Sequence, residues 1–183
     1  RFWPGLSLSG RSDLHCYFWP AATRLLKPGG FFGFLTSSSW LDVEYGFDLQ
    51  RWVLENFKLI AVLESAEEPW FEGARVKTCV TILQRCADEG ERMSNVVRFV
   101  RINKPIAELL GDAGSDDEDA RQRAADQVRD LIMRVTADYA DENIRIIVKR
   151  QKDLWAEGTG EAVQEGFKAY VGGKWGRYVR APD

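Results

Sequence analysis

The first half of the chain alternates two patterns of apolar residues. Apolar residues recur at helical spacing before residue 26 and again in residues 48–57. Residues 31–35 and 59–63 are instead short apolar runs with no polar alternation. Such runs are typical of strands covered on both faces, as in a parallel sheet flanked by helices. The order helix, strand, helix, strand predicts an α/β fold.

The first predicted helix has clear start and stop signals. Ser12 or Asp13 is expected to cap its first turn. Pro28 cannot continue the helix, and the two glycines that follow allow the positive φ angles of a tight turn. Its apolar face at helical spacing consists of Leu14, Phe18, Ala21, Ala22 and Leu25. We therefore expect a helix that buries this face, a turn, and then the strand of residues 31–35.

Polar residues follow the strand of residues 31–35. Thr36 and three serines, Ser37, Ser38 and Ser39, stand at its carboxyl end. Open α/β sheets place their binding crevices at this end of the strands, so these hydroxyls mark a candidate site. Further along, residues 76–83 form another apolar run after the loop of residues 64–75. Because a parallel crossover needs a longer connection, we expect this strand to lie antiparallel to that of residues 59–63.

The composition changes after residue 86. Residues 87–92 form a polar connector, and the alternation in residues 95–102 predicts a strand at the edge of the sheet or outside it. Pro105 favours a short helix over residues 104–110, near whose first position it stands. The acidic loop of residues 111–119 suits the amino terminus of a helix.

That helix is expected to be long and amphipathic, with a packing role. Its apolar stripe consists of Val128, Leu131, Ile132, Val135 and Tyr139. Residues 143–148 are strand-like, and a basic patch follows at residues 149–152.

Composition and charge exclude several classes of protein. The 183 residues are 45% hydrophobic and 29% charged, with a net charge of −3, which argues against a surface that binds nucleic acid everywhere. No apolar run approaches the ~20 residues of a membrane span, and the amino terminus is no signal peptide. We expect a cytoplasmic protein with no membrane partner. The chain lacks an initiator Met and is expected to be a fragment.

The cysteines and the histidine do not form a metal site. Cys16, Cys79 and Cys86 have no paired spacing, so we expect reduced thiols. His15 is the only histidine and has no Cys partner at ligand spacing, so we interpret it as a packing or surface residue and expect no metal.

Four motifs follow one another in the first half of the chain. They are Asp13-Leu14-x-x-x-Phe18, Leu26-Lys27-Pro28-Gly29-Gly30, Ser38-x-Trp40-Leu41 and Trp70-Phe71-Glu72-x-Ala74-x-Val76-x-Thr78. In this order they resemble the second half of DNA adenine-N6 methyltransferases, most closely the branch of type I, type IIG and phage-defence restriction-modification systems. The turn before the strand occurs in many class I methyltransferases, whereas the Trp-Phe-Glu loop between two strands points to the adenine branch. The resemblance covers about the first half of the chain.

This resemblance implies a fold and a domain organisation. Residues 1–86 would be the second half of a class I, Rossmann-like S-adenosylmethionine-dependent methyltransferase sheet. Residues 87–183 would be a mixed α+β extension. The Trp-x-x-Tyr-x-Arg-Ala-Pro passage at residues 175–182 resembles the one that leads into the target-recognition region of these enzymes.

The resemblance also implies site residues. S-adenosylmethionine is the expected cofactor, with Phe18 on its adenine ring and Asp13 and Leu14 in the same pocket, although Leu14 and Phe18 also fit the buried face of a helix. Phe71 corresponds to the aromatic ring that stacks on the extruded target adenine, where an aromatic face restores ~1–3 kcal/mol of lost stacking. Trp70 would share the stacking or anchor the loop, and a buried loop aromatic is the alternative for both.

The expected nucleic-acid partner is double-stranded DNA. Ser38, Arg75 and Lys77 are candidates for contacts with it, and solvated charge is the alternative for the two cations. The resemblance implies methyl transfer to adenine N6 with base flipping. The alternative is a catalytically inactive, methyltransferase-like structural or interaction module.

No catalytic residue is assigned within this chain. The family accepts the N6 hydrogens with an Asn/Asp-Pro-Pro-Tyr/Phe motif and holds the cofactor's methionine end by a Gly-rich loop. Neither motif occurs in this sequence. We expect both to lie upstream of Arg1, and we expect the 183-residue chain alone to be inactive without that amino-terminal half.

Overall fold

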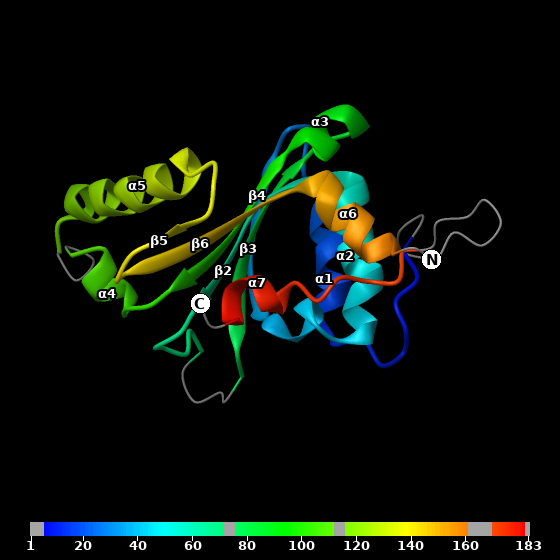
Figure 1. Ribbon diagram of the computed structural model, residues 1–183, viewed down its shortest axis with the longest axis horizontal. Helices are drawn as coiled ribbons and strands as arrows, with labels where there is room; N and C mark the ends of the chain where they lie inside the picture. Colours follow the sequence, from blue (N-terminus) through cyan, green and yellow to red (C-terminus); the bar gives the residue numbers. More distant parts are fainter. Residues whose placement is uncertain (1–5, 72–75, 112–115, 161–169, 182–183) are drawn as a thin grey trace.

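The computed structural model describes residues 6–71, 76–111, 116–160 and 170–181. Helices flank one mixed sheet (Figure 1). The elements in chain order are α1 (His15–Thr23), β1 (Phe31–Ser37), the 3-10 turn η1 (Ser38–Leu41), α2 (Glu44–Asn56), β2 (Phe57–Ser65), β3 (Thr78–Arg85), α3 (Glu89–Ser94), β4 (Val96–Ile102), α4 (Ile106–Leu109), α5 (Glu118–Arg134), β5 (Tyr139–Ala140), β6 (Ile144–Arg150), α6 (Gln151–Thr159) and α7 (Gly176–Arg180).

In the described parts of the chain the sheet has six strands, in the order β1-β3-β2-β4-β6-β5. β2 and β4 pair in parallel, and every other pair is antiparallel. The expectation that the strands on either side of the short loop are antiparallel neighbours in one sheet is confirmed. Strands from both sides of residue 86 share this sheet, while the domain boundary at that residue stays a prediction.

Each face of the sheet carries its own hydrophobic core. In Figure 1, α1, α2, α6 and α7 lie on one side of the sheet and α5 lies on the other. The larger core includes four fully buried tryptophans, Trp19, Trp40, Trp52 and Trp175. The smaller core lies between α5 and strands β4 and β6. No helix in the described parts of the chain is long and apolar enough to cross a membrane.

The prediction for the face of the first helix is wrong. Leu14, Phe18 and Leu25 are 69%, 54% and 90% exposed, and no side chain caps the start of α1. The helix instead buries Cys16, Trp19, Pro20 and Thr23. The ring of Trp19 packs edge-on against the rings of β1 and η1, 5.1 Å from Trp40. Because both stripes of this helix contain large apolar residues, only packing against the sheet decides which one is buried.

The prediction that residues 31–35 form a strand covered on both faces of a parallel sheet is also wrong. β1 pairs only with β3 among the described residues, and the pairing is antiparallel. Phe32 and Phe34 pack against the larger core, whereas Phe31 is 63% exposed. β1 is antiparallel to its neighbour because β3 returns between β1 and β2. An apolar run by itself does not specify the direction of the neighbouring strand.

The strand expected at the sheet edge or outside it lies inside. β4 runs between β2 and β6, with both of its faces packed. Its Arg98 side chain, 7% exposed, donates hydrogen bonds to the carbonyl oxygens of Met133 and Val135 at the end of α5. The last carbonyl groups of a helix have no partner within the helix and need donors from elsewhere. Because Arg98 supplies these donors, its guanidinium can be buried in this strand.

The long amphipathic helix is confirmed with one correction. Asp117 caps α5 by accepting a hydrogen bond from the Asp119 amide at 3.0 Å. Val128, Leu131, Ile132 and Val135 pack in the smaller core as expected. Tyr139, however, lies in β5 and is 37% exposed, because the helix ends at Arg134. Residues 112–115 of the acidic loop lie outside the described residues.

Candidate functional site

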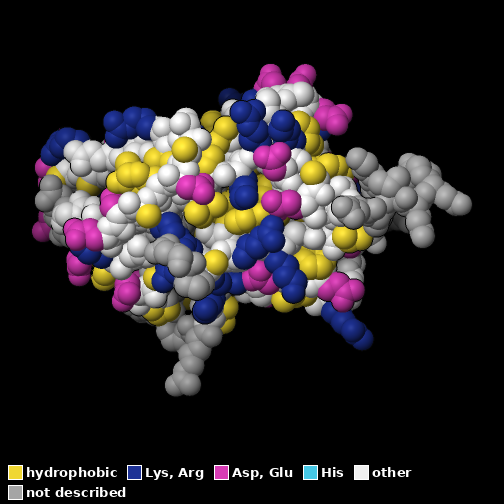
Figure 2. Space-filling model, in the orientation of Figure 1, with side chains coloured by type: hydrophobic (Ala, Val, Ile, Leu, Met, Phe, Trp, Pro, Cys, Tyr) yellow, Lys and Arg dark blue, Asp and Glu magenta, His cyan; other side chains and the backbone are white. Residues whose placement is uncertain are grey.

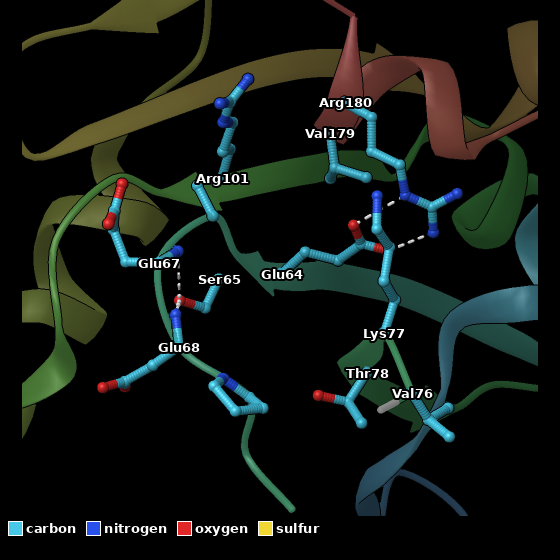
Figure 3. Close-up of a pocket in the computed structure, with 12 residues that line it drawn as sticks. Glu64, Ser65, Glu67, Glu68, Val76, Lys77, Thr78, Arg101, Val179 and Arg180 are labelled. Carbon is cyan, nitrogen blue, oxygen red and sulfur yellow. Dashed lines mark hydrogen bonds and ion pairs between the residues drawn. The ribbon is translucent and has the colours of Figure 1, made fainter. Parts of the chain in front are cut away.

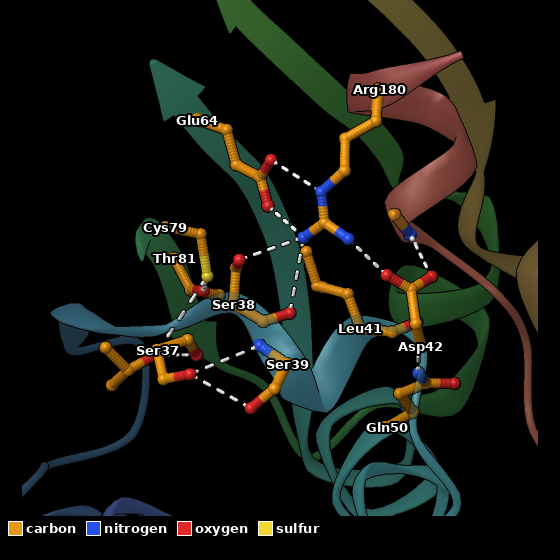
Figure 4. A network of polar contacts seen from close by, with 12 residues as sticks. Ser37, Ser38, Ser39, Leu41, Asp42, Gln50, Glu64, Cys79, Thr81 and Arg180 are labelled. Atoms are coloured by element: carbon orange, nitrogen blue, oxygen red, sulfur yellow. Dashed lines mark hydrogen bonds and ion pairs between the residues drawn. The ribbon is translucent and has the colours of Figure 1, made fainter. Parts of the chain in front are cut away.

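An arginine clamp joins the carboxyl ends of β1 and β2 to the last helix. Arg180 of α7 donates from Nε to Glu64 Oε2 at 2.9 Å and from Nη2 to Ser38 Oγ at 2.9 Å. Its Nη2 also contacts the other Glu64 oxygen, and its Nη1 contacts Asp42 Oδ2 (Figure 4). The other Asp42 oxygen accepts a hydrogen bond from the Gly176 amide at 3.1 Å. We call Ser38, Asp42, Glu64 and Arg180 the Arg180 clamp.

The clamp compensates a carboxylate that is almost fully buried. Glu64 is 5% exposed, and the guanidinium contacts both of its oxygens in bidentate geometry. Hydrogen bonding to Glu64 raises the pKa of Arg180 above its usual value. Breaking such a pair leaves an uncompensated buried charge, so this cation is tied to the protein itself.

The hydroxyls after β1 are likewise engaged within the protein. Ser37 Oγ lies 2.9 Å from Ser39 Oγ, which lies 2.5 Å from the hydroxyl oxygen of Tyr45. Ser38 is 1% exposed and accepts a hydrogen bond from Arg180. The side chain of this proposed DNA contact is therefore not at the surface. The serine cluster does stand at the carboxyl end of the strand, and there it stabilises the turn and the clamp.

A pocket of about 450 Å³ opens beside the clamp (Figure 3). It lies at the ends of β2 and β4 and the start of β3, next to α7. Its walls carry charges of both signs, two hydroxyl groups and several apolar groups. The lining residues are Glu64, Ser65, Ala66, Glu67, Glu68, Pro69, Val76, Lys77, Thr78, Arg101, Val179 and Arg180.

The loop that leaves β2 has an anchored aromatic ring followed by an exposed one. Trp70 is partly buried against the smaller core, and its Nε1 donates to Glu68 Oε1 at 3.2 Å. Glu68 Oε1 also accepts a hydrogen bond from the Ile106 amide at 3.1 Å, which ties the loop to α4. Phe71 is 40% exposed. Of the two rings, Trp70 therefore fits the anchoring role, and Phe71 has a face available to a ligand.

The structure describes only one of the two predicted cations beside this loop, Lys77. Arg75 lies outside the described residues. Lys77 is exposed and lines the pocket, and its backbone carbonyl accepts a hydrogen bond from the Ser38 amide at 2.9 Å.

The predicted cofactor residues lie together on the outer face of α1 and the turn before it. Leu14 and Phe18 are 69% and 54% exposed, and the Asp13 side chain is 45% exposed. Their alternative role as the buried face of the helix is excluded by these exposures. Beside them, burial lowers the pKa of His15, whose Nε2 lies 3.8 Å from Asp13 Oδ2.

The three thiols are free, as expected. Cys16 and Cys79 are buried and Cys86 is partly buried. Burial raises the pKa of Cys16 to about 12 and that of Cys79 to about 11. Among the described residues no group of three or more His, Cys, Asp and Glu side chains is placed to hold a metal ion.

Sequence reasoning missed the clamp. Asp42, Glu64 and Arg180 come from three distant segments, and no local pattern links them. A signal did exist for Arg180, which belongs to the Trp-x-x-Tyr-x-Arg-Ala-Pro passage. The first residue of that passage belongs to the core, since Trp175 is fully buried and its ring centroid lies 5.8 Å from that of Trp40.

The charge on the molecular face shown in Figure 2 is mixed. Basic side chains gather in the middle of this face, around the position of α7 in Figure 1, and acidic side chains lie between them. No single-sign field covers the face, in keeping with the net charge of −3. Nucleic-acid binding would therefore depend on a local site.

Comparison with known proteins identifies relatives of the first half. Residues 5–71 match the family described as Eco57I restriction-modification methylase. The chain is 30% identical over 96 residues to the type II methyltransferase M.BanIII of Aneurinibacillus aneurinilyticus, which is 52% of this chain and 16% of that protein. It is 36% identical over 99 residues to the type II methyltransferase M.XamI of Xanthomonas campestris pv. amaranthicola, covering 52% of this chain and 18% of that protein. The chain thus spans less than a fifth of the length of these curated relatives.

The fold has a counterpart among solved structures. The type IIG restriction endonuclease BpuSI superposes with a TM-score of 0.52 at 13% identity, over 80% of this chain and 15% of that chain. This likeness concerns the fold alone. Together with the sequence matches, it confirms the resemblance to restriction-modification methyltransferases and the Rossmann-like α/β fold that it implies.

Proposed function

We propose that this chain, whose residues 5–71 match a restriction-modification methylase family, is part of a site-specific DNA methyltransferase that modifies adenine N6. The observation that carries the proposal is the pair of rings in the loop that follows β2. Trp70 is anchored by Glu68, while the neighbouring Phe71 is 40% exposed. An exposed ring next to a fixed one is suited to stack on a base that has left the duplex.

The outer face of α1 fits the adenosine end of S-adenosylmethionine. The exposed ring of Phe18 offers an apolar surface, and the neighbouring Leu14 side chain extends it. The Asp13 carboxylate provides a hydrogen-bond acceptor for an exocyclic amine. This exposed apolar surface stands on the side of α1 away from its buried stripe. The bound cofactor would supply the electrophilic methyl group. The chain's own residues would hold the adenosine end at this face.

The remaining parts of the reaction are assigned outside these 183 residues. Adenine N6 is a weak nucleophile, so acceptors must hold its hydrogens while the amine lies in line with the methyl group. The Asn-Pro-Pro-Tyr motif and the Gly-rich cofactor loop that serve this purpose in the family are not in this sequence. We infer that an amino-terminal half of the catalytic domain and a target-recognition region complete the protein, and that it acts on double-stranded DNA in the cytoplasm.

Substitution of Phe71 in the full-length protein tests this function. Phe71→Ala removes a stacking face but no hydrogen bond or charge. We expect the affinity for S-adenosylmethionine to stay unchanged and the methylation efficiency to fall roughly 10-fold to 100-fold, the equivalent of ~1–3 kcal/mol of stacking. Phe71→Trp should recover most of the loss, because any aromatic face can stack. Radiolabelled methyl transfer to duplex DNA and calorimetric cofactor binding measure the two quantities.

Phe18→Ala is the matched control, since it removes a similarly exposed ring from the other proposed site. It should weaken cofactor affinity first. If the wild type transfers no methyl group to adenine, the proposed function is wrong and the inactive-module alternative stands. If the wild type is active and folded Phe71→Ala methylates normally, the ring is only loop packing and its assignment is wrong.

A further inference from the structure

The loop that bears Phe71 leaves the sheet on two stems, the end of β2 and the start of β3. We call residues 66–77 the Phe71 loop, of which 72–75 lie outside the described residues. The last residue pair that joins β2 to β3 is Leu63 with Val80. Beyond this pair, no backbone hydrogen bond joins the two stems among the described residues, and the pocket lies between them (Figure 3). Strand pairing therefore does not fix the spacing of the stems at the base of the loop.

Arg180 spans this gap from α7 (Figure 4). Its Nε donates to Glu64 Oε2, on the β2 stem, at 2.9 Å, and its Nη2 donates to Ser38 Oγ at 2.9 Å. The Ser38 amide in turn donates at 2.9 Å to the carbonyl oxygen of Lys77, the last residue of the loop before β3. One guanidinium thus connects both stems, directly at β2 and through Ser38 at β3.

The geometry of a guanidinium suits this bridge. Its nitrogens lie in one plane, so bidentate contact with Glu64 fixes the direction of the donors that reach Ser38 and Asp42. Glu64 and Ser38 are 5% and 1% exposed, so water has little access to replace these contacts. An ammonium group would keep the positive charge but has no such fork.

Contacts within the loop continue from Glu64 to the aromatic rings. The hydroxyl of Ser65, the next residue, accepts hydrogen bonds from the two following loop amides at 3.2 and 3.0 Å. The Glu68 carboxylate then accepts a hydrogen bond from the Trp70 indole at 3.2 Å. Phe71 follows Trp70 in the chain. The position of the Phe71 ring therefore depends on the position of the Glu64 stem.

We propose that Arg180 is a positioning residue, which holds both stems of the Phe71 loop and thereby sets the place of the Phe71 ring against the extruded base. The inference rests on the proposed function, because Arg180 acts here through the stacking ring. It gives α7, from the second half of the chain, a role in methyl transfer.

A double-mutant cycle in the full-length protein tests this role. Arg180→Lys keeps a cation beside Glu64 but removes the fork, so the unfolding temperature and the calorimetric affinity for S-adenosylmethionine should stay unchanged. The single-turnover methylation rate on mixed-sequence duplex DNA should fall roughly 10-fold, since a misplacement of about 1 Å can cost up to about 100-fold. In the Phe71→Ala background, Arg180→Lys should lower the rate less than about 2-fold, because the ring to be positioned is absent.

Two further variants control the cycle. Arg177→Lys is the matched control, because Arg177 lies on the same helix and pairs with Glu157 at the surface. It should leave the rate unchanged in both backgrounds. Ser38→Ala removes the hydroxyl that Arg180 contacts and leaves the pair with Glu64 in place. It should lower the rate about 2-fold to 10-fold, the effect of one hydrogen bond, and again have no further effect in the Phe71→Ala background.

Equal losses in the two backgrounds would show that Arg180 acts independently of Phe71, and the proposal would be wrong. A merely structural role gives this result, because a loss of folded protein lowers the rate by the same factor in every background. Methylation by Arg180→Lys at the rate of Arg177→Lys would also overturn the proposal. If Arg180→Lys does not fold, the cycle of Ser38→Ala with Phe71→Ala decides by the same criteria.

The outcome is distinguishable from failure of the proposed function. A wild-type protein that methylates adenine and is impaired by Phe71→Ala, with independent effects of Arg180→Lys, refutes the positioning role alone. A wild-type protein that transfers no methyl group to adenine refutes both.

Discussion

Replacing Arg180 tests the energetic importance of the clamp. Arg180→Met keeps the apolar stem and removes the guanidinium donors to Glu64, Asp42 and Ser38. The nearly buried Glu64 carboxylate then loses the cation that contacts both of its oxygens. Loss of one member of a buried pair costs about 3–5 kcal/mol. Because the Arg180 and Asp42 side chains are 28% and 32% exposed, we take the lower end, about 3 kcal/mol.

Hydrogen exchange of α7 measures this loss locally. If opening of α7 breaks the clamp, a loss of about 3 kcal/mol accelerates amide exchange in residues 176–180 by roughly 100-fold. Adding Glu64→Gln should recover part of the protection, because it removes the uncompensated charge. The two single variants and the double variant form a cycle that isolates the pair energy.

Arg177→Met is the matched control from the same helix. The Arg177 side chain is 54% exposed and pairs with Glu157 at the surface. Surface pairs contribute about 0–1 kcal/mol and are screened by salt, so exchange should accelerate less than about 5-fold, and less still in 1 M salt. The Arg180→Met effect should persist in salt. Equal protection in the two variants would refute the reasoning about Glu64.

Three further predictions follow from individual residues. The 183-residue chain alone should give no methyl transfer from labelled S-adenosylmethionine to mixed-sequence duplex DNA, and any turnover above background would contradict the assignment of the acceptor motif outside it. In the native protein at pH 8, iodoacetamide should label Cys86 and spare Cys16 and Cys79. Burial raises the pKa of Cys16 to about 12 and that of Cys79 to about 11, so both thiols stay protonated. Peptide mass spectrometry before and after denaturation checks this, and equal labelling of all three cysteines would contradict the buried positions. Gly46→Ala would place a Cβ 2.0 Å from the Trp40 carbonyl oxygen in η1 and should lower the free energy of unfolding by about 1–3 kcal/mol, or the unfolding temperature by roughly 2–10 °C. Gly33→Ala is the control, because its new Cβ meets its nearest atom at 3.5 Å and should leave the unfolding temperature unchanged. Similar unfolding temperatures of the two variants would show that η1 shifts to accommodate the new methyl group.

The sequence by itself determined the elements and much of their order. Helical spacing in residues 48–57, the turn at residues 26–30 and the apolar runs predicted α2, β1 and β2 close to where they lie. The short loop after β2 predicted its antiparallel partner because loop length limits connection geometry. These features are local, and the motifs that pointed to the family are local too.

The choice among equivalent apolar surfaces was decided only by the tertiary structure. Both stripes of α1 carry large apolar residues, and contact with the rings of β1 and η1 selected Cys16 and Trp19. The same contacts left Phe18 exposed, which changes it from a packing residue to a binding candidate. The periodicity of a sequence shows that one face of a helix is apolar, but which face is buried depends on the element that packs against it.

The site was decided by contacts between distant segments. Asp42, Glu64 and Arg180 are brought together by the return of the chain from β6 through α6 and α7, and none of them stands out in its local sequence. Whether the Glu64 carboxylate is neutralised depends on Arg180, which lies 116 residues further along the chain. That is why Glu64, an ordinary strand residue in the sequence, is held by Arg180 in the fold.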